Sequence, residues 1–512
     1  MQNQYIKKSK SIRANKEIGI ITFLVAILGY VIYVMTASLV NINSDYSEMI
    51  FLLSWLGIFL GLYVVVTWYK LTRTVFSLYT IFMLFFFLFT FGQCFMWAFG
   101  IHIPSEISQQ VALFPGFGVP SGGDIVKAQG LTLICILMFH SGAVICYKPR
   151  TKPRIKAKVS QQDAVKIDDS ITLKSIYYAC LIASLVVVPI TLYYVYTDFQ
   201  LSSVYGYSAL YSSEFVVKGA TVSGLLSKMF FPCLVGLLIG SGYNKKVQMN
   251  VYIAFAIYLL INLLAGDRSS WIYKIVILVW LSHTCYKPIN FKRLAKYAVI
   301  AIVGLYITHA IVSFRDVGLS NITVASVFDS LSFKDSPIIS GIFEMGSTMN
   351  LTIVLQKYGW DVWPYANTYL LAILGMVTNG VIYALGIPFA LLSDWYSQSY
   401  LGISWGAGFS IIAEAVINVG PIIAPLIMIV LGYIITSMIY LDKEMSYKER
   451  PFRFFFAAAT LHNFITIIRN ESHVLLKDWF YGVVCLCIFI LVIRKCCFGA
   501  HGEYKTRLGE KG

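Results

Sequence analysis

Long apolar runs, each about the length of a membrane span, recur along this chain and limit the folds open to it. A helix needs roughly 20 apolar residues to cross the hydrocarbon core of a bilayer. Only 13% of the residues are charged, against about 25% in soluble proteins. Apolar runs occupy approximately residues 18–40, 49–69, 74–99, 125–147, 176–197, 223–242, 247–265, 270–286, 296–314, 409–440, 453–468 and 475–493. They predict an all-α, polytopic integral membrane protein with about 12 transmembrane helices, forming a single domain over residues 1–512.

The basic residues predict the orientation of these helices. With the N-terminus inside, seven segments face the cytoplasm, and they hold 30 of the 40 Lys and Arg residues but only 9 of the 25 acidic ones. They are the N-terminal tail, 70–73, the basic loop 148–175, 245–246, 287–296, 442–453 and the C-terminal tail. Because Lys and Arg collect on the cytoplasmic side, both termini are expected there. The net charge of +15 is therefore attributed to topology and not to nucleic-acid binding.

The segment 315–408 is expected to face outward, as one large periplasmic or extracellular loop between spans 9 and 10. It has no Lys or Arg beyond residue 357. Its stretches "YGWDVWPY" and "SDWYSQSY" are rich in the Trp and Tyr residues typical of a membrane–water interface. The apolar stretches 337–356 and 368–392 predict interfacial or re-entrant helices. Two true spans there would raise the number of transmembrane helices to 14.

Neither a disulfide framework nor a metal site is indicated. The chain has ten cysteines, most of them inside apolar runs, without zinc-site spacing. Motifs such as HExxH, CxxC or a phosphate-binding glycine loop do not occur in a suitable context. We therefore expect no metal and no cofactor.

Three arginines stand at the outer ends of outward-running helices, where basic residues are least expected. Arg268, Arg315 and Arg469 occur in "AGDRSS", "SFRDVG" and "IIRNESH", and each has an acid within two positions. A guanidinium group keeps its charge at low dielectric and binds phosphate through two parallel hydrogen bonds. The cluster is thus interpreted as a site for a lipid-linked diphosphate. The alternative is snorkelling combined with local ion pairs.

Further polar residues converge on the same predicted side. Glu344 and Thr348 in "GIFEMGSTMN" are four apart, as are Glu414 and Asn418 in "GFSIIAEAVINVG", so each pair is expected to share a helical face. Glu414 has two open interpretations: direct chemistry, or a buried partner for one of the arginines. His473 is the histidine of a polar outer loop beside Arg469.

These motifs, in the order "LLAGDRSSW", "SFRD", "FEMGSTMN", "GFSIIAEAVINVGP" and "IIRNESH", resemble the Wzy-type O-antigen polysaccharide polymerases. The resemblance covers most of the chain from about residue 250 onward and is weak before residue 240. It implies a metal-independent glycosyltransferase in the bacterial plasma (inner) membrane, with its active site on the periplasmic or extracellular side. The donor would be a growing glycan on undecaprenyl diphosphate, and the acceptor a terminal sugar hydroxyl of a lipid-linked repeat unit. A flippase and a chain-length regulator of the same pathway would be partners.

Roles for the candidate residues follow from that chemistry. Arg268, Arg315 and Arg469 would stabilise the leaving diphosphate, and Glu344, or as second choice His473, would accept the proton of the hydroxyl. The expected substrate-binding residues are Asp267, Ser269, Ser347, Thr348, Glu414, Asn418 and Glu471. Three alternatives stay open: a lipid-linked oligosaccharide flippase, an O-antigen-type ligase, and a non-catalytic scaffold.

Overall fold

Helices form all the regular structure in the residues that this computed structural model describes. Those residues are 2–40, 46–147, 159–205, 220–265, 271–290, 336–403, 405–443 and 445–509, with positions 292, 293, 295–297, 299, 302, 304 and 306. The chain divides into two compact units. Unit 1 comprises Met1–Thr151, Ala301–Lys443 and Phe464–Leu475, and unit 2 comprises Lys152–Ile300, Glu444–Asn463 and Leu476–Gly512.

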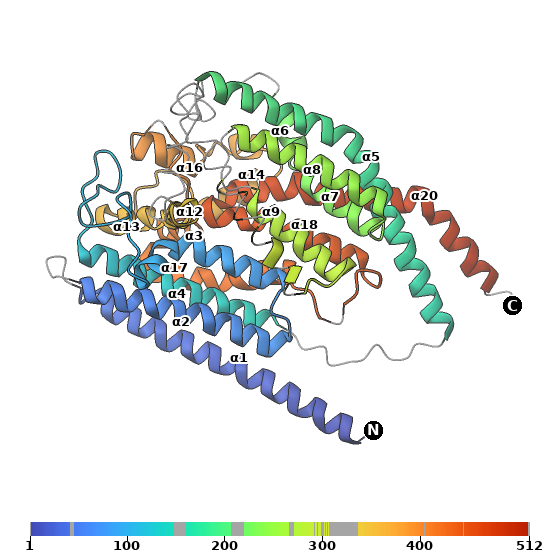
Figure 1. The fold of residues 1–512 in the computed structure, drawn as a ribbon, viewed down its shortest axis with the longest axis horizontal. Coiled ribbons are helices and arrows are strands. Elements are labelled where there is room, and N and C mark those ends of the chain that lie inside the picture. Colours follow the sequence, from blue (N-terminus) through green and yellow to red (C-terminus); the bar gives the residue numbers. More distant parts are fainter. Residues whose placement is uncertain are drawn as a thin grey trace. The chain divides into compact units, whose positions relative to one another are not determined.

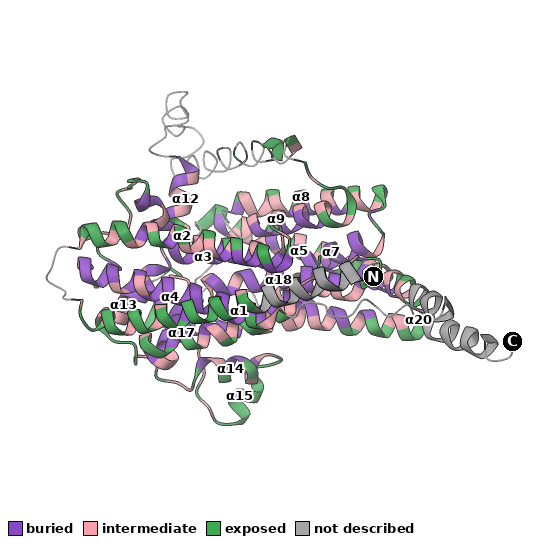
Figure 2. Cartoon of the chain, turned by 90° about the horizontal axis from the view of Figure 1, so that it is seen from below, coloured by how far each residue is buried: buried purple, intermediate pink, exposed green. Residues whose placement is uncertain are grey.

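Unit 1 is built around α4 (Gly122–Cys146), which packs against α17, α1, α2 and α13 (Figure 1). Nearly every residue of α4 is buried, whereas α1 and α2 leave many apolar side chains exposed (Figure 2). The other helices of this unit are α1 (Gln2–Ala37), α2 (Ser47–Thr72), α3 (Leu78–Ala98), α12 (Pro337–Gly346), α13 (Met349–Tyr358), α14 (Thr368–Gly375), α15 (Gly380–Ala384), α16 (Leu392–Asp394), the π-helix η5 (Trp395–Tyr400) and α17 (Ile411–Ile439). An apolar surface on the outer helices suits contact with lipid.

Two glycines allow α4 and α17 to approach closely. A Cβ atom added at Gly142 would lie 2.0 Å from the carbonyl oxygen of Ile429, and one at Gly432 would lie 2.1 Å from that of Phe139. Small residues at such crossings are how helices pack in a bilayer, where van der Waals contact replaces the hydrophobic effect.

Helix α17 is broken in its middle. Gly420 has φ 79°, which favours glycine, and Pro421 follows it. The hydroxyls of Tyr30 and Tyr33, both on α1, donate to the carbonyls of Ile422 (2.9 Å) and Pro421 (3.1 Å). These bonds provide partners for backbone groups at the break, as an apolar environment requires.

In unit 2 the long helix α5 (Val159–Tyr205) packs against α6, α7, α8 and α20. The helices here are α6 (Ala220–Ser227), α7 (Phe230–Gly240), α8 (Lys245–Ala265), α9 (Ile272–Leu281) with the π-helix η3 (Ser282–Tyr286), the π-helix η7 (Phe480–Val484) and α20 (Cys485–Gly509). The division between the units falls within α18 (Pro451–Thr466) and α19 (Ser472–Trp479), and the short 3₁₀ helix η6 (Ile467–Arg469) belongs to unit 1.

Eleven helices among the described residues are long and apolar enough to cross a membrane, which confirms the prediction of an all-helical protein with many spans. Ten of them coincide with predicted spans. The eleventh, Pro337–Tyr358, lies in the predicted outward loop 315–408. The predicted span 270–286 is a shorter apolar helix, Ile272–Tyr286, and 296–314 lies largely outside the described residues. Helix α5 begins at Val159, so the second half of the predicted loop 148–175 is helical.

The α4–α17 crossing generates a stability prediction. Gly432→Ala should lower the midpoint of thermal unfolding, because overpacking against a backbone oxygen costs about 1–3 kcal/mol. Gly341→Ala, in α12, is the matched control, since no atom lies within 4 Å of its added Cβ. Because alanine favours a helix more than glycine does, the unfolding midpoint of Gly341→Ala should stay unchanged or rise slightly. Melting curves of both purified variants test this, and a Gly432→Ala midpoint at or above wild type would contradict it.

Candidate functional site

Eight of the twelve predicted site residues lie in the described part of unit 1: Glu344, Ser347, Thr348, Glu414, Asn418, Arg469, Glu471 and His473. Asp267, Arg268, Ser269 and Arg315 lie outside the described residues. The described site residues therefore belong to three segments, around residues 344, 414 and 469.

Glu414 lies in the first turn of α17, which begins after its N-cap Ser410, and its side chain is fully buried. Its Oε1 accepts a hydrogen bond from the hydroxyl of Thr368 at 2.8 Å. Its Oε2 accepts one from the backbone N–H of Ser472 at 2.8 Å and another from the Ser472 hydroxyl at 2.9 Å. Among the described residues, the partners of Glu414 are therefore hydroxyl and amide donors, and Arg469 is not one of them.

Asn418 shares the Glu414 face of α17, as its spacing predicted. Its Nδ2 donates to the Thr368 hydroxyl at 2.6 Å and to the Glu414 carbonyl at 2.7 Å. Its Oδ1 accepts from the backbone N–H of Thr368 at 2.9 Å. Glu414 and Asn418 thus both hold Thr368, at the start of α14, by hydrogen bonds.

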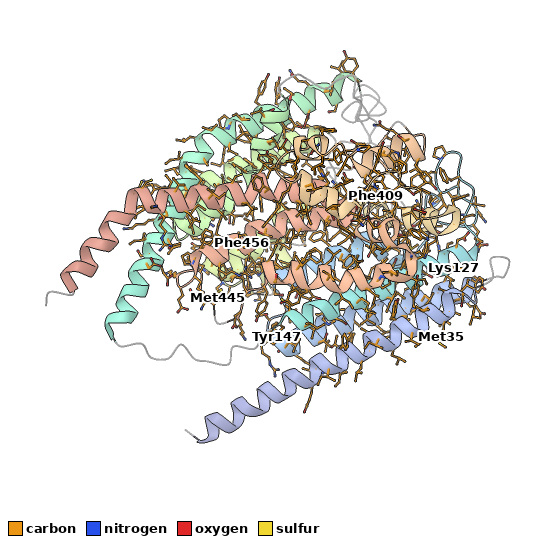
Figure 3. All side chains as sticks on the ribbon, turned by 180° about the vertical axis from the view of Figure 1, so that it is seen from behind. Met35, Lys127, Tyr147, Phe409, Met445 and Phe456 are labelled. Atoms are coloured by element: carbon orange, nitrogen blue, oxygen red, sulfur yellow. The ribbon has the colours of Figure 1, made fainter. Side chains whose placement is uncertain are left out.

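Arg469 ends η6 and lies on the partly exposed side of this network. Its Nη2 is 3.9 Å from Oε1 of Glu344, and the two side chains are 31% and 45% exposed. That separation gives attraction without a direct hydrogen bond, so the guanidinium fork can still bind an anion. The Arg469 carbonyl accepts from the N–H of Phe409 at 3.3 Å. Phe409, labelled in Figure 3, is buried beside Tyr396 with ring centroids 5.2 Å apart.

The predicted common face of Glu344 and Thr348 is wrong. Helix α12 ends at Gly346 and α13 begins at Met349, with a turn between them. Glu344 is exposed, whereas Thr348 is buried and its hydroxyl donates to the Phe89 carbonyl at 2.5 Å. The Ser347 hydroxyl donates to the Glu344 carbonyl at 2.7 Å. The turn lets one side chain face outward while the other packs against α3.

Glu471 is buried between Arg469 and the Glu414 network. Its Oε2 accepts from the backbone N–H of Ser393 at 3.1 Å, and its Oε1 has no hydrogen-bond partner in the described part of the chain. Burial, and to a smaller extent the nearby Glu414, raise the pKa of this carboxyl from its ordinary 4.5 to about 8. Glu471 is therefore expected to be largely protonated at neutral pH.

His473 is also buried, at 4% exposure. Its Nε2 lies 3.1 Å from Oδ1 of Asn379, and its ring centroid is 4.7 Å from that of Phe389. These contacts hold the imidazole against the segments that precede and follow α15.

Several residues of the network were missed by sequence reasoning: Thr368, Ser393, Ser472 and Asn379. Thr368 follows Asn367, whose side chain caps α14 by accepting from the N–H groups of Tyr369 and Leu370. The stretch "YANTYLL" carries that capping signal. Nothing in the sequence pairs Ser393 with Glu471, because 78 residues separate them.

The arrangement combines a partly exposed cation, an exposed carboxylate nearby, and a buried polar network that holds their segments in place. Such a site can bind an anionic group through Arg469 and accept a proton at Glu344.

Comparison with known proteins now adds the family. A family model described as O-antigen polysaccharide polymerase Wzy matches residues 18–501, nearly the whole chain. This protein belongs to that family. No curated protein and no solved structure matches the chain. The family resemblance seen in the sequence is confirmed, and it extends into the first 240 residues, where the motifs were weak. Family membership implies an O-antigen repeat-unit polymerase, and the many apolar helices are those of a multi-pass membrane protein.

The raised pKa of Glu471 predicts a pH-dependent stability of this Wzy-family chain. The unfolded chain releases the Glu471 proton near pH 4.5, whereas the folded chain holds it to about pH 8. The free energy of unfolding should therefore fall as the pH rises between these values. Glu471→Gln, which imitates the protonated carboxyl, should lose less stability over that range than wild type.

Thermal unfolding between pH 5 and pH 8.5 measures this difference. Glu449→Gln, at an exposed position, serves as the matched control and should follow wild type. Equal pH dependence of wild type and Glu471→Gln would contradict the assignment.

Proposed function

We propose that the protein polymerises undecaprenyl-diphosphate-linked oligosaccharide repeat units into a surface polysaccharide, an O-antigen or capsule, at the outer face of the bacterial plasma membrane. The growing glycan is transferred from its lipid diphosphate to the terminal sugar hydroxyl of an incoming lipid-linked unit. The observation that carries this is the Arg469–Glu344 pair at 3.9 Å, in a chain of the polymerase family.

The reaction forms a bond between the acceptor oxygen and the anomeric carbon, while the bond from that carbon to the diphosphate breaks. The bonding electrons leave with the diphosphate, so negative charge grows there in the transition state. Arg469, together with Arg268 and Arg315, stabilises that charge through charge-assisted hydrogen bonds. Three guanidinium groups supply the role that a metal ion plays in other phosphate-releasing enzymes, and the proposed chemistry is therefore metal-independent.

Glu344 accepts the proton of the acceptor hydroxyl. Its exposure of 45% supports this role over His473, which is 4% exposed and packed against Phe389. A base must reach the reacting hydroxyl before its proton affinity matters.

The remaining predicted site residues divide by burial. Ser347 lies beside Glu344 and is proposed to contact substrate, together with Asp267 and Ser269. Thr348, Glu414, Asn418 and Glu471 are held in internal hydrogen bonds, which supports a positioning role. In this scheme Glu414 holds the segment of Arg469 and the start of α14 in the positions that the two lipid-linked substrates require.

The distribution of Lys and Arg supports an outer active site with both termini in the cytoplasm. A flippase of the same pathway would deliver the lipid-linked units to this face, and a chain-length regulator would limit the product.

Replacing Arg469 tests the proposed function. In cells lacking this gene, Arg469→Ala should leave mainly single-repeat glycan, because losing one stabilising donor costs about 10²- to 10³-fold in rate. Arg450→Ala, at an exposed position, is the control and should restore full-length chains. Glycan length on gels is the measurement, with the amount of each variant checked by blot.

Each other outcome has a definite meaning. Complete loss of surface glycan in cells lacking the gene would favour a flippase. Full-length glycan from Arg469→Ala would show that this arginine is structural.

Replacing Glu344 tests the base. Glu344→Gln keeps the size of the side chain and removes its ability to take a proton, so turnover should fall by about 10²- to 10⁴-fold. Glu344→Asp should retain part of the activity. Wild-type turnover in Glu344→Gln would exclude this residue as the base.

A further inference from the structure

Unit 2 contains a buried lysine whose ammonium has no counter-ion among the described residues. Lys274, on α9, is 7% exposed. Its Nζ donates to the hydroxyl of Tyr258 at 2.6 Å and lies 4.7 Å from the centroid of that ring and 5.9 Å from that of Tyr273. A tyrosine can satisfy only part of this charge, because an ammonium group has three donors. A buried cation without an anion is costly in an apolar helix bundle and points to a functional site.

A second lysine of the same unit shows the contrast. Lys228 follows α6, and its side chain is 39% exposed, yet its Nζ lies 2.8 Å from Oδ2 of Asp478. The lysine with better access to solvent has a carboxylate partner, whereas the described residues supply none to the buried one. Within the described part of this unit, a lysine without an anion is therefore not the general case.

Trp271 provides a second unpaired donor beside Lys274. It precedes Lys274 by three residues at the start of α9, a spacing that brings side chains to one helical face. The indole is 9% exposed, and its Nε1–H has no hydrogen-bond partner among the described residues. The start of α9 also presents the positive end of the helix dipole, which favours a bound anion.

His462 of α18 adds a third polar group. Its ring centroid lies 5.8 Å from that of Tyr273 and 4.9 Å from that of Phe231. Its buried Nδ1 has no partner in the described part of the chain. Since either tautomer is open to a neutral imidazole, this nitrogen can donate to an incoming anion.

We propose that Trp271, Lys274 and His462 form a binding site for a phosphate group carried by a lipid. Together, an ammonium, an indole N–H and an imidazole match the several acceptor oxygens of a phosphate. The neighbouring helix α8 supports a lipid source, because it turns Tyr258 inward and exposes Ile253, Ile257, Leu260 and Leu264, a surface for an apolar tail.

The anion site follows from these three groups alone, whereas assigning its phosphate to a polyprenyl lipid rests on the proposed function. In a polymerase that joins two lipid-linked substrates, this site in unit 2 would hold one lipid phosphate.

Thermal unfolding of the full chain without ligand is the first test. Lys274→Met removes the charge and keeps most of the side-chain volume, so the variant should melt at the same or a higher temperature than wild type. A lower melting temperature would mean that Lys274 stabilises the folded chain, and it would overturn the proposal. Lys246→Met, at an exposed position of α8, is the matched control and should not change the melting temperature.

Ligand binding to the full chain in nanodiscs is the second test, measured by native mass spectrometry with undecaprenyl phosphate, phosphatidylglycerol and inorganic phosphate as probes. Lys274→Met should weaken undecaprenyl phosphate binding by about tenfold or more, because it removes a charge-assisted hydrogen bond. Trp271→Phe keeps an aromatic ring, removes the N–H and should weaken binding by a smaller factor. Wild-type affinity in both variants would overturn the site.

The probes separate the possible sources of phosphate. Tighter binding of undecaprenyl phosphate than of the other two supports the polyprenyl assignment. Equal binding of phosphatidylglycerol, or binding of inorganic phosphate alone, would overturn that assignment while retaining the anion site. Because no polymerisation occurs in this assay, failure of the anion site is distinguishable from failure of the proposed polymerase activity.

Discussion

The carboxyl group of Glu414 is the contact on which the candidate site depends, because three segments of unit 1 meet there. It accepts hydrogen bonds from Thr368 at the start of α14 and from the backbone and hydroxyl of Ser472. A buried acid is tolerated only when its oxygens are satisfied, so the network holds these segments together as long as the helices remain packed. Arg469 lies just before Ser472 in the chain, and its placement near Glu344 follows from this anchoring.

Irregular backbone in unit 1 occurs where the site or its supports require it. In an apolar environment each freed backbone group needs a partner inside the protein. Next to the break in α17 at Gly420, two backbone carbonyls accept hydrogen bonds from the hydroxyls of Tyr30 and Tyr33 of α1. The hydrogen bond from the Thr348 hydroxyl to the Phe89 carbonyl fixes the turn between α12 and α13. That turn exposes Glu344 while burying Thr348. The close packing of α4 and α17 then provides a rigid support for a site formed by shorter segments.

Hydrophobic periodicity and length were sufficient to predict most of the fold, because a span is a local property of the sequence. Pro337–Tyr358 was harder to recognise, since Gly and polar residues interrupt its apolar run. The site was predicted in part: Glu344, Glu414, Asn418 and Arg469 were named, and the pairing of Glu414 with Asn418 followed from helical spacing. The partners Thr368 and Ser472 were not, because they are 46 and 58 residues from Glu414 and no local pattern specifies them. Arg268 and Arg315 stay predictions.

In the proposed mechanism, this chain alone joins lipid-linked repeat units without a metal ion. The most direct measurement is the product ladder formed by the purified full chain in nanodiscs, supplied only with a lipid-linked repeat unit and excess EDTA. The account predicts lipid-linked glycans of several repeat lengths, since the donor and the acceptor are both present and arginines stabilise the leaving diphosphate. A ladder that appears only after a divalent metal is restored would contradict this mechanism. So would the absence of any ladder, if the same protein restores long glycans in cells.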